Sequence, residues 1–563
     1  MVRSGRDRSK DEASVKGGSR KLTEFIKRGP PVGAEPAGVS PGLRDSRAAE
    51  TSEAPARRPS FSVTVNGVEF DVFLDAVRTS SYVSSLTNLE LSDEVPESYL
   101  LGSYYSGEFR KAYLKFYDDV SGKIYVWVDK TGHMPYFLTD TPPGELNQKI
   151  VKDKSFEKVE VIKKYDLLRG REVTVTKVVA KDPLAIPRMR DLVTNAWEAN
   201  IKYHDCYVFD NGLIPGMRYR ANGRGLTLIQ PKLSDDVLSL YRNVVSGEED
   251  LLELALRMAP LFEERPPEMR RLAVDIEVYT PTRLRIPDPS DAQYPVISVA
   301  LAGTDNLRRV LVTYREGLNA ESVERLRSLN AEVEVFDCER ALLMEVFRAM
   351  NSYPLIITFN GDNFDLPYLH NRAVLLGVDP LYIPIEDVRD FVGVRHGFHV
   401  DLYKFFSIEA VQNYAFSQAY KEKTLDAIAQ ALLGEAKVTI EISVSDLTLD
   451  RLVEYNLKDA ELSLNLTTFN RELVWKLIIQ IMRLAKMSLE DVTRRKVSAW
   501  VKNLMYWEHR RNNHLIPERE ELKRLKGEVK TTAKIGGKRY AGAIVIEPMP
   551  GVYFNVVVLD FAS

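Results

Sequence analysis

A chain of 563 residues is long enough for several domains, each with its own hydrophobic core. Its hydrophobic fraction of 44% and charged fraction of 28% are ordinary for a soluble protein, and it has no apolar run of about 18 residues that could cross a membrane. The net charge of -3 neither favours nor excludes nucleic acid, because a basic groove can lie within a nearly neutral total.

Cysteine usage and the N-terminus together predict a cytoplasmic protein. The two cysteines, Cys206 and Cys338, are far apart and offer neither a disulfide framework nor the spacing of a zinc site. The first residues are polar and charged, without the apolar segment that a signal peptide needs.

Residues 1–60 are rich in Gly, Pro, Ser, Ala and charged residues, which predicts a disordered tail. Within it, Leu22, Phe25 and Ile26 have the i, i+3, i+4 spacing of one helical face, as a short docking helix would need. A chance apolar trio explains the same spacing. Residues 61–96 are predicted to be a poorly defined linker.

Residues 97–267 are predicted to form a strand-rich N-terminal domain without a catalytic constellation. Alternating or β-branched segments indicate strands at 109–116, 123–128 and 173–179, and a turn at 129–132. Apolar periodicity predicts helices at 187–199 and 249–258.

Residues 268–470 change to an α/β pattern. The predicted strands are 272–278, 296–302, 309–313 and 355–359, and the predicted helices are 340–350, 366–376, 425–433 and 449–468. Three strands come before the helices, which favours a mixed sheet with helices on its faces over a strictly alternating, doubly wound sheet. A helical segment is expected at 471–530, and strands with a Gly-punctuated turn at 531–563. The chain is therefore predicted to be a multidomain protein of the α/β and α+β classes.

Acidic residues stand at the end of the first α/β strand. Asp275 and Glu277 are separated by one residue, so their side chains point to the same face of the strand. Two neighbouring carboxylates repel each other unless a cation lies between them. Alone, this pattern is equally typical of a solvated strand end.

Two more elements carry acids. Asp365 follows a tight turn after a buried strand and opens a helix, where a carboxylate also serves as a cap. Tyr455 and Asp459 are four residues apart in a helix, so the phenol and the carboxylate share a face. Four carboxylates and a phenol suit two-metal phosphodiester hydrolysis, because paired divalent ions need anionic oxygen ligands.

These motifs resemble Exo I, Exo II and Exo III of the proofreading 3′→5′ exonuclease of family B DNA polymerases, the DEDDy type with an RNase H-like fold. The resemblance is wider than the motifs and points to the crenarchaeal replicative branch. It rests on Asp-Ile-Glu-Val-Tyr-Thr-Pro at 275–281, Phe-Asn-Gly-Asp-Asn-Phe-Asp-Leu-Pro at 359–367, and similar matches at 129–137, 399–406 and 500–504. It covers the chain from about residue 97 onward.

The resemblance implies a role for each matching residue. Asp275, Glu277, Asp365 and Asp459 would bind two Mg²⁺ or Mn²⁺ ions, and Tyr455 would orient the nucleophile. DNA contacts are implied for Asn360, Phe364, Tyr540 and Gly542. Loose matches suggest uracil sensing by Pro135 and Tyr136, and sliding-clamp binding by Leu22, Phe25 and Ile26, where Ser19 replaces the usual glutamine.

The final residues, from Asp560 to Ser563, resemble the start of polymerase motif A, in which Asp560 would hold a polymerase metal ion. The start of the polymerase palm is therefore expected at 531–563, and the remaining palm, fingers and thumb are not recognised. Nucleotidyl transfer needs two metal-binding carboxylates, so this chain alone is not expected to polymerise. A split gene, an intein or frameshift, and a fragment all remain open.

The sequence thus predicts part of a DNA-directed DNA polymerase used in replication, with an intact proofreading exonuclease that acts on primer-template DNA and single-stranded 3′ ends. A second chain or a missing C-terminal part would complete the polymerase. Two alternatives remain: a scaffold that binds DNA or the clamp, and a stand-alone DEDDy repair exonuclease.

Overall fold

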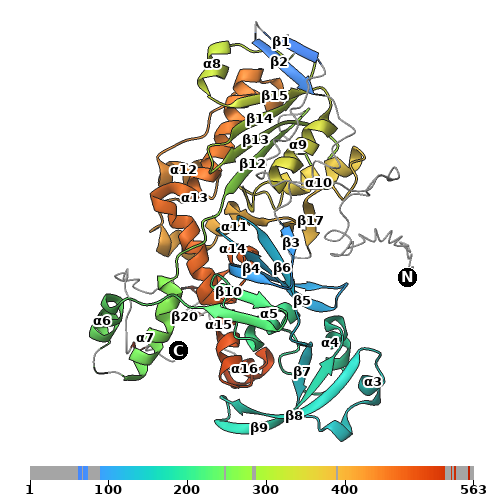
Figure 1. Cartoon of the computed structure of the whole chain (residues 1–563), viewed down its shortest axis with the longest axis vertical. Helices are drawn as coiled ribbons and strands as arrows, with labels where there is room; N and C mark the ends of the chain where they lie inside the picture. The colour runs from blue at the N-terminus through green and yellow to red at the C-terminus, as the bar shows by residue number, and fades with distance from the viewer. Residues whose placement is uncertain are drawn as a thin grey trace, which may run out of the picture. The chain divides into compact units, whose positions relative to one another are not determined.

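The computed structural model describes residues 61–65, 68–73, 89–245, 247, 249–281, 287–316, 318–388, 391–526, 534–535, 538–539 and 556–557. The chain divides into two compact units (Figure 1): the first comprises Met1–Pro135, Ala180–Pro183 and Ile201–Asn512, and the second comprises Tyr136–Val179, Leu184–Asn200 and Asn513–Ser563. None of the described helices has both the length and the apolar composition that a membrane crossing requires.

The largest sheet of the first unit has eight strands. In spatial order they are β1 (Phe61–Val65), β2 (Val68–Phe73), β15 (Glu332–Phe336), β14 (Arg308–Thr313), β13 (Val296–Gly303), β12 (Arg271–Val278), β16 (Leu355–Thr358) and β19 (Phe398–Asp401). Strands β14, β13 and β12 are antiparallel neighbours, whereas β16 and β19 continue from β12 in parallel. The mixed sheet predicted from the order of the elements is confirmed, and the segment 61–73 of the expected linker supplies β1 and β2.

Helices cover both faces of this sheet (Figure 1). The long helix α13 (Leu449–Ala485) packs on one face, where Ala273 and Leu457 share a buried cluster. Helices α9 (Glu339–Asn351) and α10 (Asp365–Leu375) belong to the other face, where Val274 and Val346 share a second cluster. Side chains of β12 alternate between the two clusters, so its odd-numbered residues face α13.

Helix α13 consists of two helical stretches, because Phe469–Glu472 has non-helical backbone angles. This break falls where the predicted helix 449–468 ends. Arg271, at the start of β12, is 2% exposed and donates from Nη1 to the Thr467 carbonyl at 2.9 Å. Its guanidinium also pairs with Glu472 and covers the Trp475 ring at 5.5 Å. Strand β12 is thereby tied to the break in α13.

A six-stranded sheet forms the other part of the first unit. Its order is β11 (Gly225–Ile229), β10 (Arg218–Asn222), β4 (Val95–Ser106), β5 (Lys111–Tyr117), β6 (Ile124–Val128) and β3 (Leu89–Leu91). The unit also contains the α-helices α5 (Tyr203–Asp210), α6 (Asp235–Val244), α7 (Glu249–Glu263), α8 (Val323–Ser328), α11 (Leu402–Phe406), α12 (Leu425–Leu433), α14 (Leu489–Arg494) and α15 (Val497–Arg511), and the hairpin of β17 (Ile385–Val388) and β18 (Phe391–Val394). Helices α5 and α15 share a buried cluster with β4 and β5.

The second unit is built on a three-stranded sheet of β7 (Tyr136–Thr139), β9 (Arg171–Ala180) and β8 (Phe156–Asp166), with β9 in the centre. Its helices are α3 (Gln148–Val151), α4 (Ile186–Arg190) and α16 (Arg519–Lys526), and Lys534–Ile535 and Lys538–Arg539 form the short pair β20 and β21. The helix predicted at 187–199 is wrong beyond Arg190. Trp197 instead exchanges two backbone hydrogen bonds with Leu138, of 2.8 and 3.0 Å, and its ring packs with Val175 and Leu515. Tertiary pairing therefore overrides the local helical pattern.

A buried charge cluster joins α9 to the large sheet. Arg309 on β14, with 9% of its side chain exposed, contacts Glu345 of α9 at 2.6 Å and also pairs with Glu334 of β15. The side chains of Glu345 and Glu334 are 2% and 11% exposed. Removing the Arg309 guanidinium would leave the Glu334 carboxylate buried without its partner, whereas Glu345 would keep its ion pair with Arg348.

We expect Arg309→Met to lower the free energy of unfolding by about 3 kcal/mol, because breaking a buried ion pair leaves an uncompensated charge. Chemical denaturation at neutral pH measures this loss. The loss should shrink at acidic pH, where protonation of Glu334 removes the unpaired charge. Arg327→Met, at an exposed position of α8, is the control; equal destabilisation by both variants would contradict the role of the cluster.

Candidate active site

The end of β12 places two carboxylates on the face that carries α13. Asp275 and Glu277 are half-buried, and Ile276 between them lies in the opposite core with α9 and α10. The pairing of β12 with β13 shifts register between Glu277 and Val278. Such an irregularity bends a strand and redirects its side chains, and it falls here directly beside the two acids.

Helix α13 supplies the third carboxylate and the phenol. Tyr455 and Asp459 are one helical turn apart, so both point toward β12 from the same side of the helix. The ligand atoms of Asp275, Glu277 and Asp459 lie within 4.8 Å of one another. Residues that are 184 positions apart in sequence, 275 and 459, are thus brought together as the sequence predicted.

The fourth acid, Asp365, opens α10 and is 5% exposed. Its Oδ1 accepts the backbone N–H of Ile276 at 3.2 Å, which fixes the carboxylate beside β12. Burial raises the pKa of Asp365 to about 7, although hydrogen bonds from backbone N–H groups oppose the shift. Asp365 does not belong to the three residues whose ligand atoms lie within 4.8 Å of one another. Its charge nevertheless raises the pKa of both Asp275 and Glu277.

Withdrawal from water and mutual repulsion make these acids hard to ionise together. Burial and the neighbouring carboxylates raise the pKa of Asp275 well above its usual range. Among these carboxylates, Asp459 has the largest effect. The same causes raise the pKa of Glu277 to about 8. Burial also raises the pKa of Asp459. A cation bound among the carboxylates would relieve this repulsion.

Lys437, in the segment after α12, is a site residue that the sequence reasoning missed. Its Nζ lies 2.5 Å from Asp459 Oδ2 and 5.6 Å from the centre of the Tyr455 ring. Burial opposes its charged form, but the Asp459 carboxylate, together with Tyr455 and Asp275, outweighs burial and the pKa of Lys437 is raised. Lys437 therefore stays protonated. Nothing in the sequence pattern marks Lys437, because it is a single lysine in a segment without apolar periodicity.

Asn456 was also missed, although it is adjacent to Tyr455. Its buried side chain donates from Nδ2 to Asp275 Oδ2 at 2.8 Å and to the Asp275 carbonyl at 3.2 Å. Its Oδ1 accepts a hydrogen bond from Ser298 Oγ at 2.6 Å. Asn456 therefore links β13, β12 and α13 and fixes the orientation of the Asp275 carboxylate.

The loop between β16 and α10 contains Asn360 and Phe364, the predicted DNA contacts. Asn360 has a φ of +71°, a left-handed conformation that asparagine tolerates. Asp401, fully buried at the end of β19, accepts the backbone N–H groups of Asn360 at 2.8 Å and Asp362 at 3.1 Å. Both predicted residues are half-buried, and Phe364 packs against the Tyr368 ring at 5.5 Å. Their contact with DNA stays a prediction.

The donor set fits a divalent cation. It consists of carboxylate oxygens, which are the ligands that Mg²⁺ and Mn²⁺ prefer. Asp459 Oδ1 is buried and has no hydrogen-bond partner among the described residues, so this oxygen is available to a cation. The repulsion among the carboxylates and the buried oxygen without a hydrogen-bond partner both indicate that this site binds a cation.

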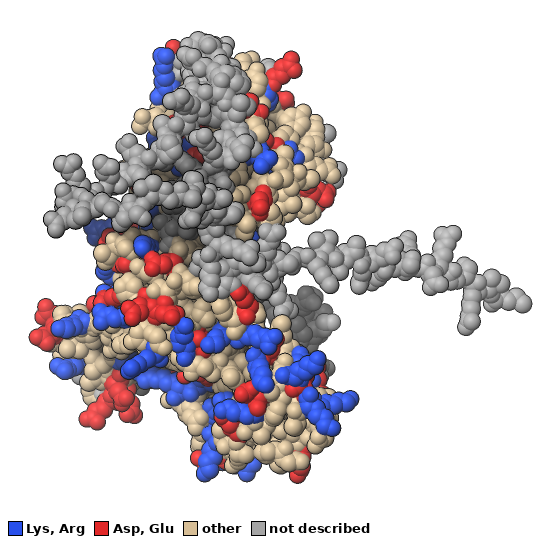
Figure 2. Space-filling view, turned by 45° about the vertical axis from the view of Figure 1, so that its right-hand side comes forward, with Lys and Arg blue, Asp and Glu red and all other residues tan. Residues whose placement is uncertain are grey.

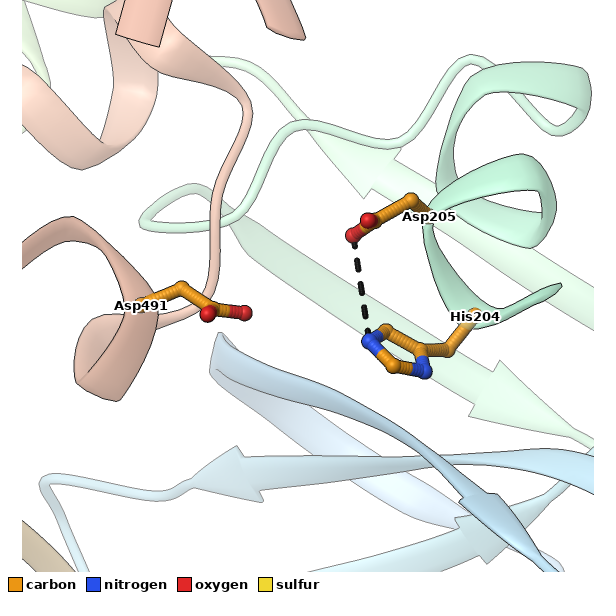
Figure 3. Close-up of side chains that lie close together, drawn as sticks. All are labelled: His204, Asp205 and Asp491. Atoms are coloured by element: carbon orange, nitrogen blue, oxygen red, sulfur yellow. Dashed lines mark ion pairs between the residues drawn. The ribbon is translucent and has the colours of Figure 1, made fainter. Parts of the chain in front are cut away.

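A second group with ligand-type side chains lies elsewhere in the first unit. His204 and Asp205 of α5 and Asp491 of α14 point toward one another (Figure 3), with ligand atoms within 4.8 Å. One of its acids already has a cationic partner, since Asp491 accepts from Arg495 at 2.6 Å, and Asp205 lies 3.9 Å from the His204 ring. We assign no ion to this group.

The other predicted residues fall into two sets. Pro135 is buried and its carbonyl accepts the Ala180 N–H at 2.9 Å, and Tyr136 begins β7 with Lys177 Nζ 4.2 Å above its ring. Uracil sensing by Pro135 and Tyr136 stays a prediction. The remaining positions lie outside the described residues: Leu22, Phe25, Ile26, Tyr540, Gly542 and Asp560.

Comparison with known proteins decides the family. Residues 194–410 match the family described as DNA polymerase family B, exonuclease domain. DNA polymerase 1 of Sulfolobus acidocaldarius is 44% identical over 509 residues, which are 89% of this chain and 58% of that protein. DNA polymerase 1 of Sulfurisphaera ohwakuensis is 47% identical over 84% of this chain and 54% of that protein. This chain belongs to DNA polymerase family B.

The fold agrees with this family. A solved structure of the family B DNA polymerase from the archaeon Pyrobaculum calidifontis matches 78% of this chain and 53% of that chain, with a TM-score of 0.56 and 22% sequence identity. The chain spans about half the length of the curated relatives that it matches. The matched exonuclease region contains Asp275, Glu277 and Asp365 and ends before Tyr455 and Asp459.

Without divalent ions, the site should destabilise the fold as pH rises. Glu277 shifts from an ordinary pKa of 4.5 to about 8 and Asp365 from 3.8 to about 7, so the folded site binds more protons than the unfolded chain in these windows. Stability then falls with increasing pH. Mn²⁺ should oppose this loss by binding the ionised carboxylates.

We therefore expect the increase in Tm produced by Mn²⁺ to be larger at about pH 8 than at about pH 6, as measured by thermal denaturation. The double variant Asp275→Asn, Glu277→Gln should flatten both the pH dependence and the response to Mn²⁺. Equal Mn²⁺ shifts at the two pH values would contradict the raised pKa values.

Proposed function

We propose that this chain carries a metal-dependent 3′→5′ exonuclease that removes nucleotides from DNA ends. The observation that carries the proposal is the convergence of four carboxylates, Asp275, Glu277, Asp365 and Asp459, from three separate elements onto one place. Like charges gathered away from water need a cationic ligand, and phosphodiester hydrolysis is the reaction that such a ligand set serves best.

The proposed cofactor is a pair of Mg²⁺ or Mn²⁺ ions, with the four carboxylates as ligands. Bound there, such ions lower the pKa of water and neutralise charge on the phosphate. Asn456 holds the Asp275 carboxylate through the hydrogen bond of 2.8 Å, so this ligand is pre-oriented. Asp365 is held in the same way by the N–H of Ile276.

Tyr455 is suited to donate a hydrogen bond. Burial, followed by the charge of Glu277, raises the pKa of its phenol, so the O–H stays protonated at neutral pH. A protonated phenol beside three carboxylates can orient the attacking water or a phosphate oxygen without titrating. Lys437, protonated against Asp459, places a positive charge where the phosphate of a DNA end would approach.

The parent activity that we propose is DNA-directed DNA synthesis in replication, because the relatives that match most of this chain are DNA polymerases. The DNA 3′ end would be its substrate in both reactions, and Asp560 would belong to the polymerase site. On the face in Figure 2, Lys and Arg gather in several places with Asp and Glu interspersed among them, so the net charge of -3 hides local positive surface. Such patches suit contacts with phosphates.

Location and partners follow from this substrate. We propose a cytoplasmic location, where an archaeal replication enzyme meets DNA. Primer-template DNA and single-stranded 3′ ends are the proposed ligands. Binding of a sliding clamp through Leu22, Phe25 and Ile26 stays a prediction, as do the second chain or C-terminal part that would complete the polymerase.

We expect the double variant Asp275→Ala, Glu277→Ala to lose at least about 1,000-fold in the rate of 3′-end digestion, because two ligands of the cation are removed. The assay follows shortening of end-labelled single-stranded and mismatched DNA in the presence of Mg²⁺ or Mn²⁺. Omission of divalent ions should abolish the activity of the unmodified chain.

The matched control is the double variant Asp250→Ala, Glu253→Ala, which removes one Asp and one Glu from exposed positions of α7. Its rate should equal that of the unmodified chain. Undiminished digestion by the double variant at Asp275 and Glu277 would contradict the assignment of these residues to an exonuclease site. Binding of DNA without any digestion by the unmodified chain would favour the scaffold alternative.

A further inference from the structure

Helix α14 lies between the two sheets of the first unit. It packs against β19 of the eight-stranded sheet, against α11, and against β4 of the six-stranded sheet. Its last residue, Arg494, is 132 positions away in sequence from Asp362, which belongs to the loop between β16 and α10. The guanidinium nevertheless reaches this loop, and only 9% of the Arg494 side chain is exposed.

The contact between Arg494 and Asp362 is a two-pronged ion pair. Arg494 Nε donates to Asp362 Oδ2 at 2.7 Å, and Nη2 donates to Oδ1 at 3.0 Å. The remaining guanidinium groups contact His399, whose carbonyl accepts from Nη1 at 3.2 Å and whose Nδ1 lies 2.9 Å from Nη2. Only a planar guanidinium can make this set, since an ammonium group cannot form the parallel pair.

This ion pair holds the loop 360–364, which leads directly into Asp365 of the active site. Asp362 lies between Asn360, with its left-handed backbone, and Asp365, which opens α10. Asp401 already binds the N–H groups of Asn360 and Asp362. The loop is therefore fixed through its backbone by β19 and through its one buried side-chain charge by α14.

A purely stabilising role accounts poorly for this arrangement. Taking two charges out of water costs about as much free energy as their attraction returns, so a buried ion pair is weak evidence for stability. What a forked pair does supply is a fixed geometry for the groups that it joins. The group that needs a fixed geometry here is the Asp365 carboxylate, three residues after Asp362.

We propose that Arg494 is a positioning residue of the exonuclease: through Asp362 it sets the loop 360–364 and thereby the place of the Asp365 carboxylate beside β12. The inference rests on the proposed exonuclease function. It adds a residue from outside the matched exonuclease region 194–410 and makes α14 part of the support of the active site.

The test compares Arg494→Ala with Arg495→Ala in the same chain. Arg495 is the next residue along and pairs with Asp491 of α14 at 2.6 Å, so it is the matched control. We expect Arg494→Ala to lower kcat for digestion of a single-stranded 3′ end by about 10- to 100-fold with a smaller change in KM, because displacement of a catalytic group by about 1 Å costs up to 100-fold. Arg495→Ala should keep the rate of the unmodified chain.

Two further measurements separate positioning from mere folding. Guanidinium ion at millimolar concentration should restore part of the lost rate in Arg494→Ala and none in Asp275→Ala, because it can refill the space opposite Asp362. Arg494→Lys should recover little, since it restores charge without the fork. Asp362→Asn should reproduce the loss, and combining it with Arg494→Ala should add almost nothing.

The outcomes are distinguishable. If the unmodified chain fails to digest 3′ ends, the proposed function fails. If that chain digests and Arg494→Ala digests equally well, the positioning role is wrong. A loss of rate that guanidinium does not restore, together with a matching fall in Tm, overturns it in favour of a structural role. If Arg494→Ala does not fold, Asp362→Asn decides by the same comparison of kcat and Tm.

Discussion

Repulsion among carboxylates is the constraint on which this active site depends. The ligand atoms of Asp275, Glu277 and Asp459 are held within 4.8 Å of one another. Burial and the neighbouring carboxylates raise the pKa values of Asp275 and Glu277, burial raises the pKa of Asp459, and no group among the described residues cancels all of this charge. The fold must therefore hold the acids against their own repulsion. It does so with backbone and amide donors, as in the hydrogen bonds from Asn456 to Asp275 and from Ile276 to Asp365.

Buried carboxylates have different partners in the active site and in the structural core. In the structural core several buried acids are paired with a guanidinium: Glu345 and Glu334 with Arg309, and Asp362 with Arg494. Among the described residues, Lys437 is the one cation that forms an ion pair in the site, and its partner is Asp459. Incomplete compensation of charge, together with a buried Asp459 Oδ1 that has no hydrogen-bond partner among the described residues, is the pattern expected of a ligand set for cations.

Family membership and site geometry support each other from different parts of the chain. The match to the family B exonuclease domain ends at residue 410, before the helix that carries Tyr455 and Asp459. The structure shows that α13 lies on the face of β12 that presents Asp275 and Glu277, so the later residues complete the same site. The tie between Arg271 and the break in α13 fixes this relation at the other end of β12.

Local periodicity alone determined which side chains could share a face. The two-residue repeat of a strand put Asp275 and Glu277 together, and the helical turn put Tyr455 beside Asp459, because both relations depend only on backbone geometry within one element. The mixed sheet also followed from the order of strands and helices. The resemblance to a family joined these separate pairs into one site, and no rule of local structure could have done so.

Only the tertiary structure decided the rest. Lys437, Asn456, Asp401 and Arg494 act on residues far away in sequence, and each looks ordinary within its own segment. The segment around Trp197 shows the same limit, since its helical pattern lost to backbone pairing with Leu138. Periodicity specifies the face of an element, but contacts between distant elements depend on how the whole chain packs. The sequence thus determined which acids this protein offers, and the tertiary structure decided which cation, amide and guanidinium hold them in place.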